Sequence, residues 1–467
     1  MTDRPNILLF FTDDQRSDTI GALGGPVLTP NLDRLCASGT TFTEACIMGG
    51  SRQAVCMPSR AMLHTGRSLY RIQGEGQTIP PDHAMLGESL RRAGYDTFGT
   101  GKWHNSTEPF VRSFSHGAEI YFGGMGDHWN VPVFQFDPSG RYEGHMPQTT
   151  DFRAQSVSRR RGDHVRPGVH STELFCDAVI HFLRDRRPGD APFFAYLSFL
   201  APHDPRTMPP EFLEMYPPSE VELPPSFLPE HPFDNGELRV RDELLAGFPR
   251  GEDEVREHLA AYYAMISHVD AHVGRVLHQL ERAGLAEDTV VVFAGDNGLA
   301  VGQHGLMGKQ SLYEHSVGVP LIFAGPGVPE GERRQALACL TDIFPTLCEL
   351  TGVETPGSVE APSLAPCLAD GNAAVRDHVL FAYRHFMRGV RDTAGNKLIE
   401  TAAAGRRHTQ LFDLADDPFE TRDLSGDPAR AEVLSGLRRE LTSWRRDLGD
   451  DQEGQGAEFW PQMEWDR

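Results

Sequence analysis

The chain lacks several features that would place it in a special class of protein. Its 467 residues contain no apolar run near the ~18 residues that a membrane-spanning helix needs. They contain no low-complexity tract, and 24% charged residues is ordinary for a globular protein. The 7 cysteines are odd in number and show no Cys-x-x-Cys spacing, which argues against a disulfide framework or a zinc–thiolate site. We therefore expect a globular protein whose cysteines are mostly buried in the core.

Positive charge is scarce: 44 Lys and Arg stand against 66 Asp and Glu, for a net charge of −22. This balance excludes a broad nucleic-acid-binding surface. If the ligand is an anion, the groups that bind it must be concentrated inside a pocket.

The first apolar stretch, residues 7–11, is too short for a signal peptide, which needs ~7–15 apolar residues after a basic start. We therefore expect a cytoplasmic protein, with a trimmed exported protein as the alternative. No membrane partner is expected.

Apolar runs alternate with helical patterns, which is typical of βαβ units and a mostly parallel sheet. The sequence thus predicts an α/β fold. We expect strands at 7–11, 95–100, 193–200, 290–294 and 319–324, and helices at 29–39, 85–92, 172–185 and 257–282. Residues 105–170 and 202–250 show no clear period and are expected to form long loops beside the ligand site. A Pro/Ser/Gly-rich stretch around 354–375 predicts a boundary between domains 1–370 and 371–467.

Polar, chemically capable residues follow four of the predicted strands. In open α/β sheets, ligands bind beyond the carboxyl ends of the strands. Each pair alone is also ordinary loop sequence, but four pairs at one edge predict a functional site. In chain order the pairs are Asp13 and Asp14, Lys102 and His104, His203 and Asp204, and Asp296 and Asn297.

The chemistry of these residues is consistent. The oxygen donors Asp13, Asp14, Asp296 and Asn297 suit a hard divalent cation such as Ca²⁺ or Mg²⁺. A second group supplies positive charge and proton-transfer capacity: Lys102, His104, His203 and Lys309. Together the oxygen donors and this second group predict a site for a tetrahedral oxyanion.

The most specific segment is Cys56-Met57-Pro58-Ser59-Arg60, which continues to Thr65-Gly66-Arg67. Pro58 suits the first position of a helix and Gly66 its C-terminal end, so Cys56 is expected at a helix N-terminus. The backbone N–H groups there favour negative charge. From the residues alone, Cys56 is either a reactive thiolate or a buried structural cysteine.

This segment resembles the signature of type I sulfatases, C-x-P-S-R followed by x-x-L-x-T-G-R, at every defined position. The resemblance extends along nearly the whole chain, and it implies an alkaline-phosphatase-like α/β/α sandwich with a smaller C-terminal α+β domain. The further segments that carry it are Gly101–His104, Pro202–Asp204, Gly295–Gly298, Gly305–Lys309 and Leu411–Leu414.

By that resemblance, a formylglycine-generating enzyme oxidises Cys56 to Cα-formylglycine, whose hydrate attacks the sulfur. The resemblance also implies a Ca²⁺ ion, with Mg²⁺ as the alternative, bound by residue 56 and the four oxygen donors. Arg60 would lie beside the nucleophile and help to keep it ionised. Lys102, His203 and Lys309 would hold the sulfate oxygens, His203 or Lys309 would protonate the departing alcohol, and His104 would take the proton from the second hydroxyl.

Three alternatives remain beside a sulfatase acting on a small-molecule or carbohydrate sulfate ester. The first is a phosphonate or phosphate ester hydrolase on the same scaffold, although that group typically has His where this chain has Asn297. The second is a non-catalytic protein that binds sulfated ligands. The third is a thiolate-based hydrolase that uses His203 and Asp204.

Some further polar residues have both a structural and a functional interpretation. Arg206 could bind a carboxylate or second sulfate, and His304 could contact the substrate. Glu314 and His315 could shape the pocket. His64 is expected to pack, and the run of Arg159–Arg161 is expected to be a solvated turn.

Overall fold

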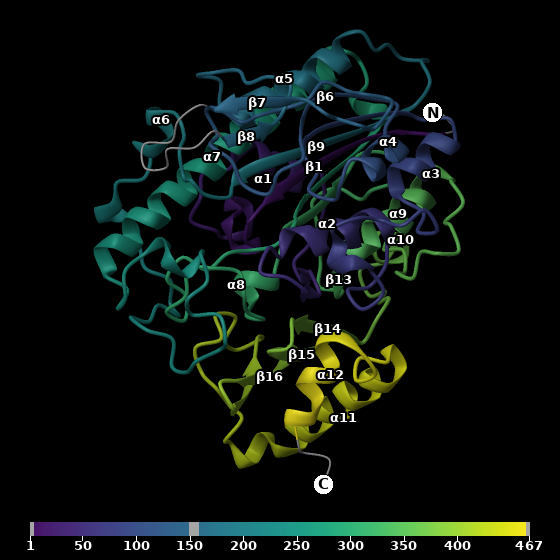
Figure 1. Cartoon of the computed structure of the whole chain (residues 1–467). Coiled ribbons are helices and arrows are strands. Elements are labelled where there is room, and N and C mark those ends of the chain that lie inside the picture. Colours follow the sequence, from purple (N-terminus) through teal and green to yellow (C-terminus); the bar gives the residue numbers. More distant parts are fainter. Residues whose placement is uncertain (1–3, 149–157, 464–467) are drawn as a thin grey trace.

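The computed structural model describes residues 4–148 and 158–463, and an eight-stranded sheet lies at its centre (Figure 1). Strands β10, β1, β9, β5 and β6 are parallel, whereas β11 runs antiparallel to both of its neighbours. The predicted α/β fold with a mostly parallel sheet is therefore confirmed. The strand order is β12 (Glu332–Arg334), β2 (Gly39–Phe42), β11 (Leu321–Ala324), β10 (Thr289–Gly295), β1 (Asn6–Asp13), β9 (Phe193–Pro202), β5 (Asp96–Lys102) and β6 (His116–Tyr121).

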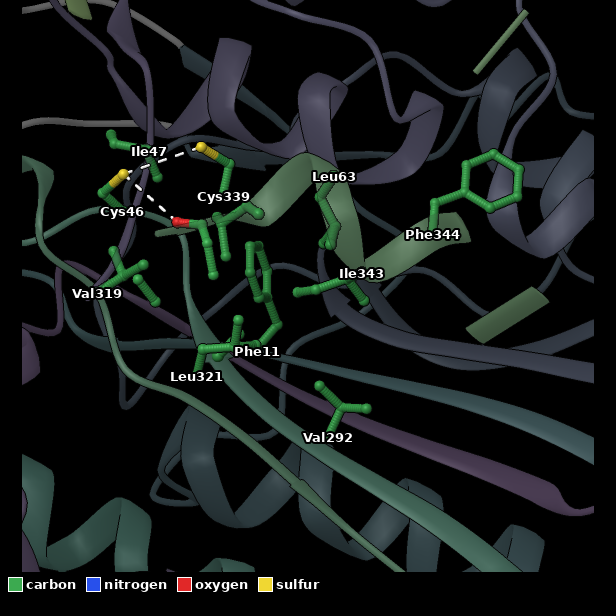
Figure 2. Packing of buried hydrophobic residues seen from close by; sticks show 14 of the residues in the cluster. Phe11, Cys46, Ile47, Leu63, Val292, Val319, Leu321, Cys339, Ile343 and Phe344 are labelled. Atoms are coloured by element: carbon green, nitrogen blue, oxygen red, sulfur yellow. Dashed lines mark hydrogen bonds between the residues drawn. The ribbon is translucent and has the colours of Figure 1, made fainter. Parts of the chain in front are cut away.

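The central strands are apolar throughout because helices cover both faces of the sheet. In β1, Leu8 and Phe10 pack in one hydrophobic cluster with residues of α1 (Pro30–Ala37), α5 (Ser171–Arg184) and α7 (Glu252–Arg282). The alternate residues Ile7, Leu9 and Phe11 pack in another cluster with residues of α2 (Cys56–Thr65), α3 (Leu86–Arg92) and α9 (Ile343–Thr351). Figure 2 shows part of this second cluster, where Phe11 lies among side chains from α2 and α9. The layers are those of the expected α/β/α sandwich.

A second sheet of five strands lies at the C-terminal end of the chain, below the large sheet in Figure 1. Helices α11 (Ala431–Leu448) and α12 (Gly454–Phe459) pack on this sheet. One strand, β4 (Gly49–Gly50), comes from the N-terminal part of the chain and pairs in parallel with β14. Gly49 has φ +91°, and a Cβ there would lie 2.2 Å from the carbonyl oxygen of Ala382. The order is β17 (Arg406–Asp413), β16 (Asn396–Ala403), β15 (Met387–Asp392), β14 (His378–Tyr383) and β4.

Some of the loops and element boundaries expected from the sequence were wrong. The expected loop 105–170 contains α4 (Glu108–Ser113), β6 and an antiparallel pair of strands, β7 (His145–Gln148) and β8 (Ser158–Arg161). The long helix begins at Glu252 rather than near 257, and its first turn holds three acidic residues, which the helix dipole favours. Strand β11 begins at Leu321, two residues later than expected. The edge strand β6 escaped notice because it begins with the exposed His116 and contains a glycine, so its apolar pattern is weak.

All seven cysteines are buried and free, as the sequence predicted. Two of them come together: Cys46 of β3 (Ala45–Cys46) pairs with Cys339 of β13 (Ala338–Cys339), and their sulfurs lie 3.9 Å apart (Figure 2). Across residues 4–148 and 158–463, no helix is both long enough and apolar enough to cross a membrane.

Candidate active site

The carboxyl ends of four adjacent strands bring the predicted site residues into one buried cluster. The register pairs Thr12 of β1 with Gly295 of β10, so the residues that follow these positions lie side by side. Lys102 ends β5, and His203 follows β9 on the other side of β1. Six members of the cluster are at most 3% exposed: Asp13, Asp14, Lys102, His203, Asp296 and Asn297.

Cys56 is the first residue of α2, whose C-terminus is closed by Gly66 at φ +60°. The structure corrects the position of Pro58, which is the third helical residue rather than the first; the N–H that proline lacks would be without a partner at either position. The sulfur of Cys56 lies 3.4 Å from Nδ1 of His104 and 3.5 Å from Nζ of Lys102. Burial raises the pKa of the thiol to about 11 despite the cation beside it. An unmodified Cys56 is thus protonated near neutral pH.

Asp13 lies beside two cations of the cluster, Lys102 and Arg60. Nζ of Lys102 contacts Oδ2 of Asp13, and Nη2 of Arg60 lies 3.7 Å from the same oxygen. Burial opposes ionisation of Asp13, but the charge of Lys102 and the further cations outweigh it and lower its pKa. Lys102 in turn has a raised pKa, because Asp13 more than offsets the effect of burial. Both groups are therefore charged at neutral pH.

Asp14 is held in the left-handed region, at φ +68°, so that its carboxylate meets groups from three other loops. Its Oδ1 accepts from Nζ of Lys309 at 2.5 Å and from Nδ2 of Asn297 at 2.7 Å, and its Oδ2 lies 3.6 Å from Nε2 of His203. Burial disfavours the charge of Lys309, but Asp14 raises its pKa well above the usual value. Lys309 does not directly follow a strand, but through Asp14 it belongs to the same cluster as the residues at the four strand ends.

The donor set fits a hard divalent cation. Asp13 Oδ1 and Asn297 Oδ1 are buried and have no hydrogen-bond partner among the described residues. Ligand atoms of Asp13, Asp14 and His203 lie within 4.8 Å of one another, as do those of Asp13, Cys56 and Asp296. The pKa of Asp296 rises to about 7 because of burial and the neighbouring Asp13. A dication would relieve this repulsion and satisfy the unpartnered oxygens.

His104 lies against the sulfur of Cys56 and is constrained from the other side. It has φ +71°, and a Cβ on Gly124 would lie 2.8 Å from its Nε2. Burial and the charge of Lys102 lower its pKa well below the usual value. The imidazole is therefore neutral near pH 7 and is able to accept a proton.

Arg60 is fully buried and binds groups from two neighbouring strands and the loop after β10. Its Nε donates to Asp296 Oδ2 at 3.0 Å, and its Nη1 donates to the carbonyl oxygen of Lys102 at 2.9 Å and to Ser198 Oγ at 2.5 Å. It thus contacts the acidic side of the cluster and the end of β5. Sequence reasoning missed Ser198. A serine inside the otherwise apolar strand Phe193–Pro202 could have indicated a buried hydrogen-bond partner.

Other residues singled out from sequence lie outside the cluster. His304 stacks on Tyr313 and donates to the carbonyl oxygen of Glu420, and Glu314 binds Lys397. Nη1 of Arg206 lies 2.7 Å from Nδ1 of His258. His128 is an addition that sequence reasoning missed: its Nε2 donates to the carbonyl oxygen of His203 at 3.0 Å.

Comparison with protein families and curated proteins gives a consistent result. Residues 5–353 match the family described as Sulfatase, and residues 302–447 match the C-terminal region of N-sulphoglucosamine sulphohydrolase. The multifunctional alkaline phosphatase superfamily protein PehA of Trinickia caryophylli is 28% identical, covering 96% of both chains. An arylsulfatase of Clostridium perfringens is 28% identical over 94% of both chains.

Solved structures share the fold. A phosphonate monoester hydrolase of Agrobacterium radiobacter superposes with a TM-score of 0.75 at 23% identity, covering 95% of this chain and 96% of its own. A protein solved in complex with its substrate D-glucosamine-2-N,6-O-disulfate has a TM-score of 0.71 at 22% identity, covering 96% and 99%.

Proposed function

The chain belongs to the sulfatase family, and we propose that the cluster around Cys56 is the site at which it hydrolyses sulfate esters. The observation that carries the proposal is the placement of Lys102, Lys309 and His203 beside a set of hard oxygen donors and residue 56. Without a metal, the three carboxylates Asp13, Asp14 and Asp296 balance the cations Lys102, Lys309 and Arg60. A bound dication makes the site positive, which suits a sulfate anion.

The cation of the site would be Ca²⁺, with Mg²⁺ as the alternative. Asp13, Asp14, Asp296 and Asn297 would hold it, together with residue 56. When bound, it supplies Lewis-acid polarisation of a sulfate oxygen. The unpartnered oxygens of Asp13 and Asn297 support this assignment.

Cys56 is proposed to act as formylglycine, made by a formylglycine-generating enzyme. The hydrated aldehyde supplies one hydroxyl for attack on sulfur and a second for release. Two observations support a modified residue 56: the match of Cys56–Arg60 to the family signature, and a thiol whose pKa of about 11 leaves little thiolate at neutral pH.

The neighbouring side chains have distinct roles in this proposal. The neutral His104, 3.4 Å from the sulfur position, accepts the proton from residue 56. Lys102 and Lys309 hold their protons firmly and neutralise charge on the sulfate oxygens. His203 donates the proton to the leaving oxygen. Arg60 binds and orients the carboxylate of Asp296, which would hold the metal.

The substrate class that we propose is a sulfated carbohydrate. Relatives at 24–27% identity are named N-acetylglucosamine-6-O-sulfatase, ulvan-active sulfatase and N-acetylgalactosamine-6-sulfatase. The structural neighbour bound to a glucosamine disulfate points the same way.

A phosphonate or phosphate ester hydrolase is the second candidate, because PehA matches 96% of the chain and two phosphonate monoester hydrolases each match 95% of it. The test is turnover of 4-nitrophenyl sulfate and phenyl phosphonate esters by protein produced with a formylglycine-generating enzyme, with Cys56→Ala as control. Preferential hydrolysis of the sulfate, lost in the variant, is expected. Preference for the phosphonate would establish the second candidate, and no turnover of these esters or of a glucosamine 6-sulfate would contradict both.

A further inference from the structure

One short segment of the 202–250 loop, residues 237–243, contacts the loops that carry the proposed catalytic groups. Glu243, at its end, is only 3% exposed. Its Oε2 accepts from the N–H of Met307 and its Oε1 from the N–H of Gly308, both at 2.9 Å. These are the two residues immediately before Lys309. Arg250 pairs with Glu243 and neutralises the buried carboxylate.

The close approach of Glu243 requires a glycine. A Cβ on Gly308 would lie 3.0 Å from Glu243 Oε1 and 2.3 Å from Gln310 Oε1. Because both oxygens crowd this position, the backbone before Lys309 has little freedom to move.

The residue before Glu243, Asp242, binds the side chain of Gln310, which follows Lys309 in the chain. Its Oδ2 accepts from Nε2 of Gln310 at 2.7 Å, and Oε1 of Gln310 accepts from the N–H of Lys309 at 3.0 Å. Nε2 of Gln310 also donates to the carbonyl oxygen of Gln53 at 2.9 Å, three residues before Cys56. Two consecutive carboxylates thus bind the residues on either side of Lys309: Glu243 binds the backbone of the two residues before it, and Asp242 binds the side chain of Gln310 after it.

The same segment reaches His203. Both Nη atoms of Arg241 bind the carboxylate of Asp204, with Nη1 to Oδ1 at 2.7 Å. Nδ1 of His203 donates to the carbonyl oxygen of Asp204 at 2.8 Å. This bond leaves Nε2 of His203 as the atom that faces the cluster, 3.6 Å from Asp14.

At its other end, the segment meets the C-terminal sheet. Glu237 is 3% exposed and accepts from Gln53 Nε2 at 3.0 Å, from the hydroxyl of Tyr383 at 3.2 Å and from Arg384. Tyr383 is the last residue of β14. Glu237 therefore links the end of β14 to Gln53, whose carbonyl oxygen accepts from the residue after Lys309.

We propose that the 237–243 segment positions Lys309 and His203 and couples both to the C-terminal sheet, with Glu243 as the positioning residue for Lys309. Lys309 donates to Asp14 and, in the proposed function, also binds the substrate sulfate, so the direction of its side chain depends on the position of its backbone. Small displacements of a group that stabilises the transition state reduce turnover more than binding. The proposal rests on the proposed function of Lys309 and His203.

The first test compares Glu243→Gln with Glu400→Gln. The amide keeps the volume of Glu243 but replaces one acceptor oxygen with a donor. Glu400 is the matched control: it is fully buried in the C-terminal sheet and accepts from Arg438 and Thr409, both at 2.7 Å. With 4-nitrophenyl sulfate, kcat of Glu243→Gln is expected to fall at least ~10-fold while KM changes less than ~3-fold. The control is expected to keep kcat even if its melting temperature falls.

The second test does not depend on turnover. Hydrogen exchange of the peptide spanning 300–312 is expected to be faster in Glu243→Gln than in the wild type and unchanged in Glu400→Gln. Unchanged exchange, or equal loss of kcat in both variants, would overturn the positioning role. If the wild type hydrolyses no sulfate ester, the proposed function fails, and the exchange result still decides whether Glu243 fixes the backbone before Lys309.

Discussion

Arg60 places two guanidinium nitrogens against one carboxylate oxygen of Asp296: Nε lies 3.0 Å and Nη2 lies 2.8 Å from Oδ2. Both side chains are fully buried. The other oxygen, Oδ1, accepts from the N–H of Asp14. Because burial and Asp13 raise the pKa of Asp296 to about 7, Arg60 is the cation that favours its ionised form. An interaction from α2 thus favours the ionised form of a proposed metal ligand that directly follows β10.

Replacing Arg60 with Ala leaves Asp296 without its nearest cation. Breaking a buried pair by removing one partner typically costs about 3–5 kcal/mol, so a loss of that size is expected in the free energy of unfolding measured with urea. Arg60→Lys is expected to recover only part of it, because a single ammonium cannot also reach Ser198 and the carbonyl oxygen of Lys102. Wild-type stability in Arg60→Ala would contradict the role assigned to this pair.

Residue 56 can be identified directly by mass spectrometry. In protein produced with a formylglycine-generating enzyme, the peptide that contains residue 56 is expected to be about 18 Da lighter than its cysteine form. Cys56→Ser is the control, since its peptide mass should not depend on the enzyme. An intact thiol under these conditions would exclude the formylglycine mechanism.

Asp13→Asn tests the metal site. The variant keeps the shape of the side chain but removes one negative charge and the ion pair with Lys102. Elemental analysis is expected to show loss of bound Ca²⁺, and added CaCl₂ should no longer raise the melting temperature. Asp413→Asn, at an ion pair with Arg430 in the C-terminal sheet, serves as control. Equal metal content in the two variants would remove Asp13 from the ligand set.

Gly124→Ala tests the position of His104. The added Cβ would lie 2.8 Å from Nε2 of the buried ring, which must therefore shift away from it. We expect kcat to fall about 10- to 100-fold at nearly unchanged stability, since displacement of a proton acceptor slows the chemical step. Gly357→Ala, where φ also lies outside the left-handed region and no atom lies within 4 Å of the new Cβ, controls for the backbone effect of replacing a glycine. Equal kcat in the two variants would place His104 outside the reaction.

Four histidines form a continuous column beside the cluster and predict acid sensitivity. Ring centroids are 4.8 Å apart for His128 and His170, 4.6 Å for His170 and His268, and 4.7 Å for His268 and His272. Burial, reinforced by nearby positive groups, lowers the pKa of His170 to about 3 and of His268 to about 2. The column also faces Trp129, Phe212, Asp127, Asp177 and Arg275.

The folded state holds these rings neutral, whereas the unfolded chain protonates them near pH 6.5. Stability is therefore expected to fall as the pH drops below 6.5, by about 1.4 kcal/mol for each such histidine at pH 5.5. Urea unfolding at pH 7.5, 6.5 and 5.5 measures the slope, and His268→Phe should reduce it. An unchanged slope in His268→Phe would show that this ring is not the acid-sensitive group.

The sequence by itself predicted the central sheet, because strands buried on both faces are unbroken apolar runs such as residues 193–200. It also located the chemistry: polar residues that follow such runs meet at the carboxyl edge of a parallel sheet, as Asp13, Lys102, His203 and Asp296 do. It missed the edge strands β6 and β12, because an edge strand does not need an apolar pattern on both faces, and it missed β2, whose four residues are too few to show a pattern.

Contacts between residues far apart in the chain were decided only by the tertiary structure. Lys309 follows no strand, yet it donates to Asp14, 295 residues away. Glu237 and Glu243 belong to a loop with no readable period, yet their carboxylates are buried against Gln53, Tyr383 and the backbone before Lys309. The hydrophobic periodicity of a sequence records which face of an element is buried. It does not indicate which polar groups form hydrogen bonds with each other, because those partners depend on how whole loops pack on the folded core.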